Sequence, residues 1–452
     1  MYRRFTVSGA RGVVGEGLEP RLALELSAAL AELLDDGPVV VGRDSRTSGP
    51  VFRHAVLAAL LGAGRRVIDI GVVTTPTTQL AVEWREAAGG IMITASHNPI
   101  SWNGLKFIGP SGSFLTPERV EKMKTFLAEG TAPWVGHADI GVELRWDHAV
   151  EHHIDAVCDL VDTELIAAAG LEVAVDCCGG AGGVIIPDLL ERLGVIHRDL
   201  GCRADGRFTR DPEPLAANIG ELADLVAKSD SVLGLAFDSD VDRLALVGAT
   251  GTPLGEERTL QLAALSVLEG ADKPAGLEIA CNLSTSRCLE DIAAAHGARV
   301  LRAPVGEVNV VELIRARGCP VGGEGNGGVI YPRLHLGRDA VMATALILEQ
   351  LARTGKTPEQ NLAPYPDYEI VKVKQPVPDP ATLERAYEHL RGHFPDAERD
   401  ERDGLRLAWK DRWLHLRPSG TEPVVRIFAE APDRAAAEQL VEIGRALLNG
   451  DE

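Results

Sequence analysis

Ser96 is the first residue of this sequence whose surroundings suit chemistry. It lies in Thr94-Ala95-Ser96-His97-Asn98-Pro99, directly after an apolar run at residues 90–93. The run is typical of a buried strand, and Asn98 before a proline favours an extended loop. We therefore expect Ser96 to be exposed at the carboxyl end of a strand, where open α/β sheets bind ligands. An ordinary turn serine is the alternative interpretation.

Three alternating aspartates, Asp238, Asp240 and Asp242, follow a second apolar run. In extended geometry they would lie on one side of the chain, where carboxylates about 4 Å apart repel by roughly 1 kcal/mol in water and by more in a cleft. A divalent cation removes this repulsion, and ligation by oxygen alone favours Mg²⁺. An EF-hand is excluded, because its sixth and twelfth positions would be Arg243 and Ala249. A solvated acidic turn remains the alternative.

Glu324 and Asn326 lie among five glycines between residues 322 and 328. Glycines let the backbone approach a ligand closely, and a carboxylate with an amide suits ligand hydroxyls. A flexible surface hairpin is the alternative.

A second polar loop contains Arg417, Ser419, Gly420 and Thr421, and Arg426 follows shortly after it. Two hydroxyls, a glycine and flanking guanidiniums are donors that can converge on a phosphate dianion. This loop therefore predicts an anion site.

The elements that must position these residues alternate between strand and helix, which predicts a largely parallel sheet with helices on both faces. Residues 8–12 and the Asn-Gly at 103–104 are expected as turns, and residues 147–169 as one long helix. The last segment predicts a small α+β domain. We expect four domains, at residues 1–145, 146–250, 251–365 and 366–452.

Charge and composition limit the partners. The chain has 46 basic and 66 acidic residues, a formal net charge of −20. This balance argues against nucleic acid or an anionic membrane as partner. No apolar run approaches 18 residues, and the N-terminal residues 1–5 lack the apolar core of a secretory signal peptide. A cytoplasmic protein is therefore expected. The seven cysteines include no Cys-x-x-Cys pair, so neither a disulfide framework nor a zinc site is expected.

Together these motifs resemble those of the α-D-phosphohexomutase family, which interconverts sugar 6-phosphates and 1-phosphates. The resemblance covers the whole chain and rests on six motifs in order: Ser-Gly-Ala-Arg-Gly, Gly-Arg-Asp-Ser-Arg, Thr-Ala-Ser-His-Asn-Pro, Asp-Ser-Asp-Val-Asp-Arg, Gly-Glu-Gly-Asn-Gly-Gly and Arg-Pro-Ser-Gly-Thr-Glu-Pro. It implies three related α/β domains around a central cleft and a fourth, TATA-binding-protein-like α+β domain.

The resemblance also implies residue roles. Ser96 becomes the phosphoserine and joins Asp238, Asp240 and Asp242 in holding Mg²⁺. Lys106, Arg11, His97 and Arg243 are expected as acids, bases or charge stabilisers. Glu324 and Asn326 are expected to contact sugar hydroxyls, and Arg417, Ser419, Gly420, Thr421 and Arg426 to hold the phosphate that does not react.

The expected reaction passes through a sugar 1,6-bisphosphate, which also serves as activator. Glucosamine phosphate is the expected substrate, with mannose and glucose phosphates as alternatives, and the protein is expected to be a monomer or homodimer. Many members have histidine where this sequence has Gly328, and some have histidine where it has Glu307, although His335 could approach the same region. A Mg²⁺-dependent sugar phosphatase and a sugar-phosphate sensor without activity are alternatives of other classes.

Overall fold

The computed structural model of the protein describes residues 5–130, 133–376, 380–419 and 424–449. Its contacts divide the chain into two compact units. Unit 1 consists of residues 1–267 and 326–361, and unit 2 of residues 268–325 and 362–452.

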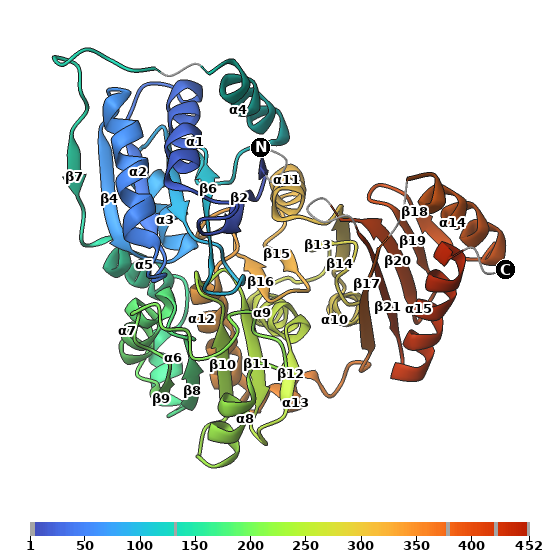
Figure 1. Cartoon of the computed structure of the whole chain (residues 1–452). Coiled ribbons are helices and arrows are strands. Elements are labelled where there is room, and N and C mark those ends of the chain that lie inside the picture. Colours follow the sequence, from blue (N-terminus) through green and yellow to red (C-terminus); the bar gives the residue numbers. More distant parts are fainter. Residues whose placement is uncertain (1–4, 131–132, 377–379, 420–423, 450–452) are drawn as a thin grey trace. The chain divides into compact units, whose positions relative to one another are not determined.

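A seven-stranded sheet opens unit 1, in the order β1-β2-β6-β5-β3-β4-β7 (Figure 1). Its strands are β1 (Phe5–Thr6), β2 (Gly9–Val13), β3 (Val39–Arg43), β4 (Val67–Val72), β5 (Gly89–Ile93), β6 (Trp102–Ile108) and β7 (Glu143–Arg145). β3 runs parallel to β4 and β5, whereas β6 is antiparallel to both β5 and β2. The sheet is therefore mixed, and the expectation of a largely parallel sheet is only partly met.

Helices cover both faces of this sheet. The four helices are α1 (Pro20–Leu33), α2 (Gly49–Gly62), α3 (Thr75–Trp84) and α4 (Pro117–Glu129). Leu30, Phe52 and Met123 of α1, α2 and α4 share one apolar core with the strands. α3 packs against β3 and β5 from the other face. α4 begins as its sequence predicts, since Thr116 accepts a hydrogen bond from the backbone N–H of Arg119.

Two segments that were expected as turns are strands. Residues 8–12 contribute to β2 and residues 103–107 lie within β6, with Arg11 directly opposite Gly104. A Cβ on Gly104 would lie 2.5 Å from the carbonyl oxygen of Ala10 and 2.7 Å from that of Thr94. The glycine after Asn103 thus serves close packing of neighbouring strands and not a turn.

The second sheet of unit 1 has the order β12-β11-β10-β8-β9. Its strands are β8 (Glu172–Asp176), β9 (Ile196–Leu200), β10 (Leu233–Phe237), β11 (Leu244–Gly248) and β12 (Pro253–Gly255). The helical segments after the first sheet are α5 (Ala149–Cys158), α6 (Thr163–Ala168), η1 (Ala181–Val184), α7 (Ile186–Arg192), α8 (Gly220–Ala227), α9 (Glu257–Gly270), α12 (Ala340–Thr354) and α13 (Pro358–Leu362). A short strand, β16 (Gly328–Ile330), precedes α12.

The single helix expected over residues 147–169 is wrong. The structure has α5 and α6 there, and they are separated by residues 159–162. Asp162 stands outside α6 and its carboxylate accepts a hydrogen bond from the backbone N–H of Leu165 at 2.9 Å. Aspartate favours this capping position, so a new helix begins here.

Unit 2 contains three parallel strands and an antiparallel sheet. The parallel strands are β13 (Glu278–Asn282), β14 (Arg299–Ala303) and β15 (Val321–Glu324), accompanied by α10 (Cys288–Ala295) and α11 (Glu307–Arg317). The antiparallel sheet has the order β17-β21-β20-β19-β18. Its strands are β17 (Glu369–Pro376), β18 (Glu398–Asp400), β19 (Leu405–Ala408), β20 (Trp413–Pro418) and β21 (Val424–Ala431).

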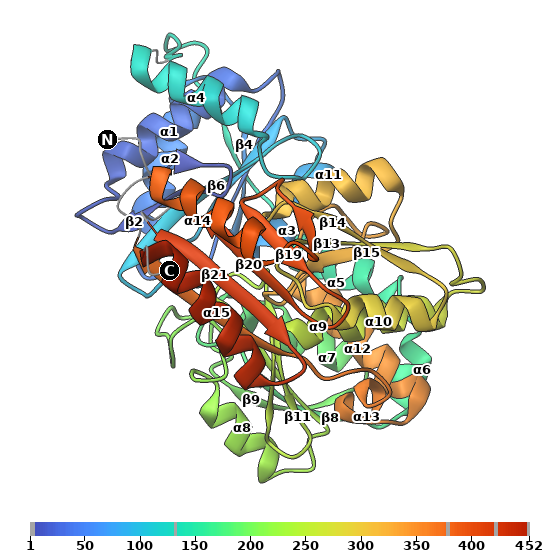
Figure 2. The same cartoon turned by 90° about the vertical axis from the view of Figure 1, so that its right-hand side faces the viewer.

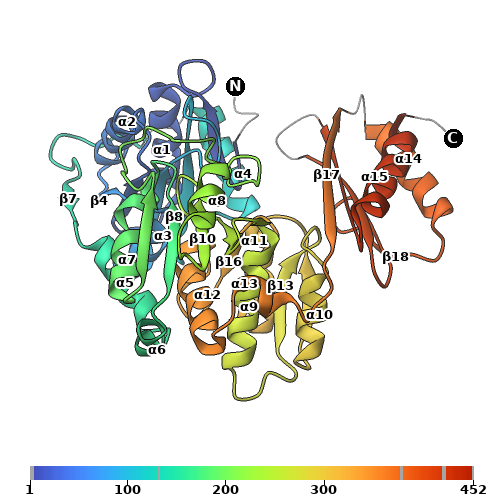
Figure 3. The same cartoon turned by 90° about the horizontal axis from the view of Figure 1, so that it is seen from below.

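Two helices, α14 (Pro380–His393) and α15 (Arg434–Asn449), cover the antiparallel sheet. Figure 2 shows them in front of the strands, and Figure 3 shows both on the same side of β17. Leu390 of α14 and Val441 of α15 pack on Leu414 and Ile427 in one apolar core. This part is the α+β domain that the sequence predicts.

Candidate active site

Ser96 follows β5, but it is not exposed. Its relative exposure is 1 %, and its hydroxyl donates to Asp238 Oδ2 at 2.8 Å. The expectation of an exposed serine is therefore wrong, because the turn after β10 covers the loop after β5. Ser96 has a φ of +50°, a left-handed conformation that costs a residue other than glycine roughly 1–3 kcal/mol and that is common at functional sites.

Arg46 holds the Ser96 loop in place. This fully buried guanidinium donates to the carbonyl oxygens of Ser96 and Asn98 at 2.6 Å each, and to those of Pro99 at 2.7 Å and Trp102 at 2.9 Å. Asp44 pairs with Arg46 Nε at 3.0 Å and compensates the buried charge. Arg46 is therefore the anchor of the serine loop.

The three aspartates converge in the turn after β10. One carboxylate oxygen from each of Asp238, Asp240 and Asp242 lies within 4.8 Å of the others. They meet because the chain turns, with Val241 at a φ of +62°, and not because the segment is extended as the sequence suggested.

The carboxylate cluster fits a divalent cation. Among the described residues, Asp240 Oδ1 and Asp242 Oδ1 are buried and accept no hydrogen bond. Burial, followed by the charges of Asp242 and Asp240, raises the pKa of Asp238 well above its usual range. Buried carboxylate oxygens without a donor are costly, and a hard cation is the partner that they lack. The cluster therefore fits a divalent cation, and Ser96, Asp238, Asp240 and Asp242 remain its predicted ligands.

Two cations share the remaining carboxylate oxygens. Lys106 of β6 places Nζ 2.6 Å from Asp240 Oδ2 and 2.8 Å from Asp242 Oδ2. Arg338 donates from Nη2 to Asp242 Oδ2 at 2.8 Å. Burial alone would raise the pKa of Asp242. The positive charges of Arg338 and Lys106 outweigh burial and hold this pKa well below its usual value. Sequence reasoning missed Arg338, which lies in no recognisable motif and becomes visible only in the fold.

His97, Arg11 and Arg243 also lie near the serine. His97 Nδ1 is 3.4 Å from Ser96 Oγ, and Arg11 Nη1 is 3.5 Å from the side-chain oxygen of Asn98. Burial, followed by the charges of Arg243 and Arg11, lowers the pKa of His97 well below its usual value. Burial and the neighbouring guanidiniums thus favour the neutral form of the imidazole.

Asn326 is the one predicted sugar contact that belongs to unit 1. Its side-chain oxygen accepts from the backbone N–H of Gly328 at 3.2 Å and from Arg338 at 3.5 Å. The same unit holds His335, which pairs through Nε2 with Asp339 at 3.2 Å, and Asp339 also pairs with His153 at 2.8 Å. His335 therefore belongs to a buried network at the start of α12.

Glu324, the other predicted sugar contact, ends β15 in unit 2. Its Oε1 accepts from the side chain of Asn282 at 2.8 Å and from the backbone N–H of Gly306 at 3.0 Å. Glu307 follows directly as the first residue of α11. These contacts fix the carboxylate beside the start of α11.

Three cations lie side by side in the antiparallel sheet of unit 2. Arg417 of β20 is directly opposite Arg426 of β21, which is opposite Lys374 of β17. Like charges at directly paired positions repel, so this row suits a bound anion. Ser419 lies at the end of the row, with its N–H donating to Val424. Sequence reasoning missed Lys374, because only strand register brings it to the arginines.

Gly420 and Thr421, predicted as phosphate donors, lie outside the described residues. Arg417 itself is fixed by Asp403, whose Oδ2 accepts from Arg417 Nε at 2.8 Å. The same carboxylate oxygen accepts from the backbone N–H of Val305 at 3.0 Å. Asp403 thus joins the predicted phosphate loop to the chain that leads into α11.

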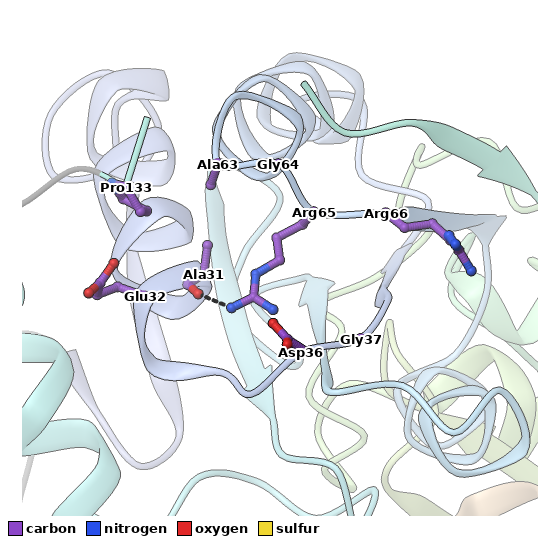
Figure 4. Close-up of a pocket in the computed structure, with 9 residues that line it drawn as sticks. All are labelled: Ala31, Glu32, Asp36, Gly37, Ala63, Gly64, Arg65, Arg66 and Pro133. Atoms are coloured by element: carbon purple, nitrogen blue, oxygen red, sulfur yellow. Dashed lines mark hydrogen bonds between the residues drawn. The ribbon is translucent and has the colours of Figure 1, made fainter. Parts of the chain in front are cut away.

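A hollow at the end of α1 contains none of the predicted site residues (Figure 4). Its central cation, Arg65, donates to the carbonyl oxygens of Ala31, Leu34 and Asp35. A cation that satisfies the last carbonyls of a helix is a structural cap. We therefore place the candidate chemistry at Ser96 and not in this hollow.

Family models match nearly the whole chain. They are those of phosphoglucomutase/phosphomannomutase: alpha/beta/alpha domain I over residues 3–133, domain II over 151–251, domain III over 256–368 and the C-terminal domain over 373–445. The chain belongs to the phosphoglucomutase/phosphomannomutase family. Membership makes it a phosphomutase, and it confirms the resemblance and the four-domain fold class expected from the sequence.

Individual relatives in the phosphoglucomutase/phosphomannomutase family agree over full length. A probable phosphoglucosamine mutase of Methanopyrus kandleri is 35% identical over 97% of this chain and 96% of its own. A phosphoglucomutase/phosphomannomutase of Thermococcus kodakarensis is 36% identical over 99% of each chain. The crystal structure of a phosphoglucomutase/phosphomannomutase family protein from Burkholderia thailandensis superposes with a TM-score of 0.88 at 25% identity, covering 100% of this chain and 98% of the other.

Proposed function

We propose that this protein interconverts glucosamine 6-phosphate and glucosamine 1-phosphate by way of phosphorylated Ser96 and a sugar 1,6-bisphosphate. One observation carries the proposal: Ser96 Oγ lies 2.8 Å from Asp238 within a buried cluster of three aspartates. A serine that carries a phosphoryl group needs cations around it, since a phosphoserine has about two negative charges.

In the first half-reaction a sugar hydroxyl oxygen attacks the phosphorus on Ser96. The new O–P bond forms, the bond between phosphorus and Ser96 Oγ breaks, and the sugar hydroxyl releases its proton. The attacking oxygen stands in line with Ser96 Oγ on the far side of the phosphorus, and a proton returns to Ser96 Oγ to restore the serine hydroxyl. His97 Nδ1, 3.4 Å from Ser96 Oγ, would therefore act at this leaving oxygen and not at the attacking hydroxyl. The second half-reaction is the reverse, with the other phosphate of the bisphosphate returning to Ser96 after the sugar has turned around.

The roles of the surrounding charges follow from their positions. Asp238, Asp240 and Asp242, with the phosphate on Ser96, would hold Mg²⁺, which supplies positive charge to the transferring group. Lys106 and Arg338 are already bonded to the aspartates and would orient the carboxylates. Arg11 and Arg243 add positive charge near the serine. Positioned charge is the main source of catalysis in phosphoryl transfer.

Most of the predicted substrate contacts belong to unit 2. Arg417 and Arg426 with Ser419, Gly420 and Thr421 would hold the phosphate that is not reacting, and Lys374 extends their row of cations. Glu324 would bind sugar hydroxyls, as would Asn326 of unit 1. Glucosamine is proposed as the sugar because the Methanopyrus relative carries that name. Glucose and mannose phosphates are the second candidates, because the Thermococcus relative is named for them.

The test is a comparison of kcat/KM for glucosamine, glucose, mannose and N-acetylglucosamine 1-phosphates, with the matching 1,6-bisphosphate supplied as activator. Glucosamine 1-phosphate should give the highest value. Release of inorganic phosphate in place of an isomer would instead identify a phosphatase, and binding without turnover would identify a sensor. Either outcome contradicts the proposed reaction.

The proposal includes a cytoplasmic monomer or homodimer whose partner is a small sugar phosphate and not nucleic acid or membrane. In the described parts of the chain, no helix is long and apolar enough to cross a membrane.

A further inference from the structure

Cys177 and Cys202 lie next to each other behind the aspartate turn. They follow β8 and β9, two parallel neighbours in which Asp176 is paired with Leu200. Their sulfur atoms are 3.4 Å apart. Adjacent strands are about 4.8 Å apart, which is compatible with the Cα separation of a disulfide, and the sulfurs need to approach only to about 2.05 Å.

We propose that Cys177 and Cys202 are a reversible oxidation site that closes to a disulfide when the protein meets a hydroperoxide. The inference goes beyond the proposed function, and the formation of the bond does not depend on it. Both cysteines are free thiols in the structure, Cys177 fully buried and Cys202 half-buried.

The two sulfurs have different roles in the reaction. Burial, followed by the hydrogen bond from Cys202, raises the pKa of the Cys177 thiol well above its usual value. The half-buried Cys202 is the sulfur that an oxidant reaches first. Its thiolate attacks the hydroperoxide, so an S–O bond forms, the O–O bond breaks, and Cys202 becomes a sulfenic acid while water or an alcohol leaves.

Cys177 then closes the disulfide. Its sulfur attacks the sulfur of the sulfenic acid, so the S–S bond forms, the S–O bond breaks, and water leaves with the Cys177 proton. The two thiols lose two electrons in total, and these electrons reduce the hydroperoxide. A dithiol reductant reverses the change by thiol–disulfide exchange.

Closure must disturb the turn that carries the aspartates. Ala181, four residues after Cys177, donates from its backbone N–H to the carbonyl oxygen of Ser239 at 2.8 Å. A Cβ on Gly182 would lie only 2.9 Å from the Cys177 sulfur, so the backbone of this glycine packs closely beside the sulfur because it carries no side chain. Shortening the S–S distance by more than 1 Å therefore shifts the chain at residues 177–182 and, through Ala181, the turn between Asp238 and Asp240.

Peptide mapping of the complete protein tests the disulfide. The protein is treated with hydrogen peroxide in small molar excess, digested without reduction and analysed by mass spectrometry. We expect a Cys177–Cys202 cross-linked peptide, a fall from seven to five titratable thiols and full reversal by dithiothreitol. Cys202→Ser should abolish the cross-link, whereas Cys158→Ser, at another half-buried cysteine, should leave it unchanged.

A second variant, Cys177→Ala, removes the buried partner without adding a polar group and should leave Cys202 as a stable sulfenic acid. Peroxide that takes wild-type Cys202 to sulfinic acid without a cross-link, or a cross-link to Cys178 instead, would overturn the proposal.

Calorimetric titration with Mg²⁺ tests whether the disulfide disturbs the aspartate turn. This experiment rests on the proposed metal site. The oxidised protein should bind Mg²⁺ at least threefold more weakly than the reduced protein, and Cys202→Ser should show no change with peroxide. Equal affinities in a fully cross-linked sample would refute the link. Absence of Mg²⁺ binding in both forms would refute the metal site instead. The peptide map would still show whether the disulfide forms.

Discussion

Arg46 Nη2 donates to the carbonyl oxygen of Ser96 at 2.6 Å, so a buried guanidinium sets the position of the serine that we propose as phosphoryl carrier. Arg46→Lys should lower kcat at least tenfold and lower the melting temperature, since an ammonium cannot span the same four carbonyls and hydrogen bonds to charged groups contribute about 1.5–3 kcal/mol each. Steady-state kinetics and calorimetry measure the two effects. Arg43→Lys is the matched control, because Arg43 is half-buried and, among the described residues, its guanidinium donates a hydrogen bond to a single carbonyl oxygen, that of Asp44. Equal behaviour of both variants would contradict the anchoring role.

Ser96→Ala should abolish turnover. The methyl group cannot carry a phosphoryl group, so incubation with the sugar bisphosphate should add 80 Da, about the mass of one phosphoryl group, to the wild-type protein and nothing to the variant. Intact-mass spectrometry makes the comparison. Near-normal turnover by Ser96→Ala would show that another residue is the phosphoryl carrier.

Asp240→Asn should weaken Mg²⁺ binding at least tenfold. An amide oxygen keeps the size of the ligand but removes the charge that makes the carboxylate a strong Mg²⁺ ligand. Calorimetric titration gives the affinity, and chelation should stop turnover of the wild type. Asp224→Asn changes an exposed aspartate with a Lys228 partner and should have no effect. Full activity of Asp240→Asn in the presence of a chelator would exclude the metal site.

Arg417→Ala should reduce kcat/KM tenfold to more than a hundredfold, since a charge-assisted hydrogen bond to phosphate contributes roughly 1.5–3 kcal/mol. Both reaction directions should suffer alike, because a mutase presents either phosphate to the same loop. Asp403→Asn should raise KM less, as it loosens Arg417 without removing it. Arg402→Ala, at an exposed arginine paired with Asp400, is the control. A loss confined to one direction would mean that the loop is not a shared phosphate site.

His415 should make unit 2 less stable at acid pH. Burial lowers its pKa to about 4, while it donates or accepts hydrogen bonds with Ser284 and Asp403. A histidine with a depressed folded pKa is protonated first in the unfolded state, so stability falls as the pH drops from about 6.5 towards 4. Between pH 7 and 5 the free energy of unfolding should fall by about 2 kcal/mol more in wild type than in His415→Gln. Urea unfolding followed by tryptophan fluorescence measures this difference, and parallel pH profiles would contradict it.

Much of this architecture could be predicted from the sequence, because periodicity and motif order are local properties. The strands that lead into Ser96 and Asp238, and the α+β character of the last domain, required no knowledge of distant contacts. Burial of Ser96 could not be predicted, since it results from a hydrogen bond to a residue 142 positions away. Arg338 and Lys374 were missed for the same reason: a lone cation has no signature until strand register and loop packing give it neighbours.

The hydrogen bonds that build the active site also constrain when it can exist. Ser96 donates a hydrogen bond to Asp238, 142 positions later in the sequence, and Lys106 donates one to Asp240, 134 positions later. Asp242 accepts a hydrogen bond from Arg338, which follows it by 96 positions. During synthesis on the ribosome, the serine loop is therefore made long before the three aspartates, and the aspartates are made before Arg338. The seven-stranded sheet can be complete while Ser96 still lacks its cover, so the full set of contacts around Ser96 forms in a late step, after residue 338 has left the ribosome exit tunnel.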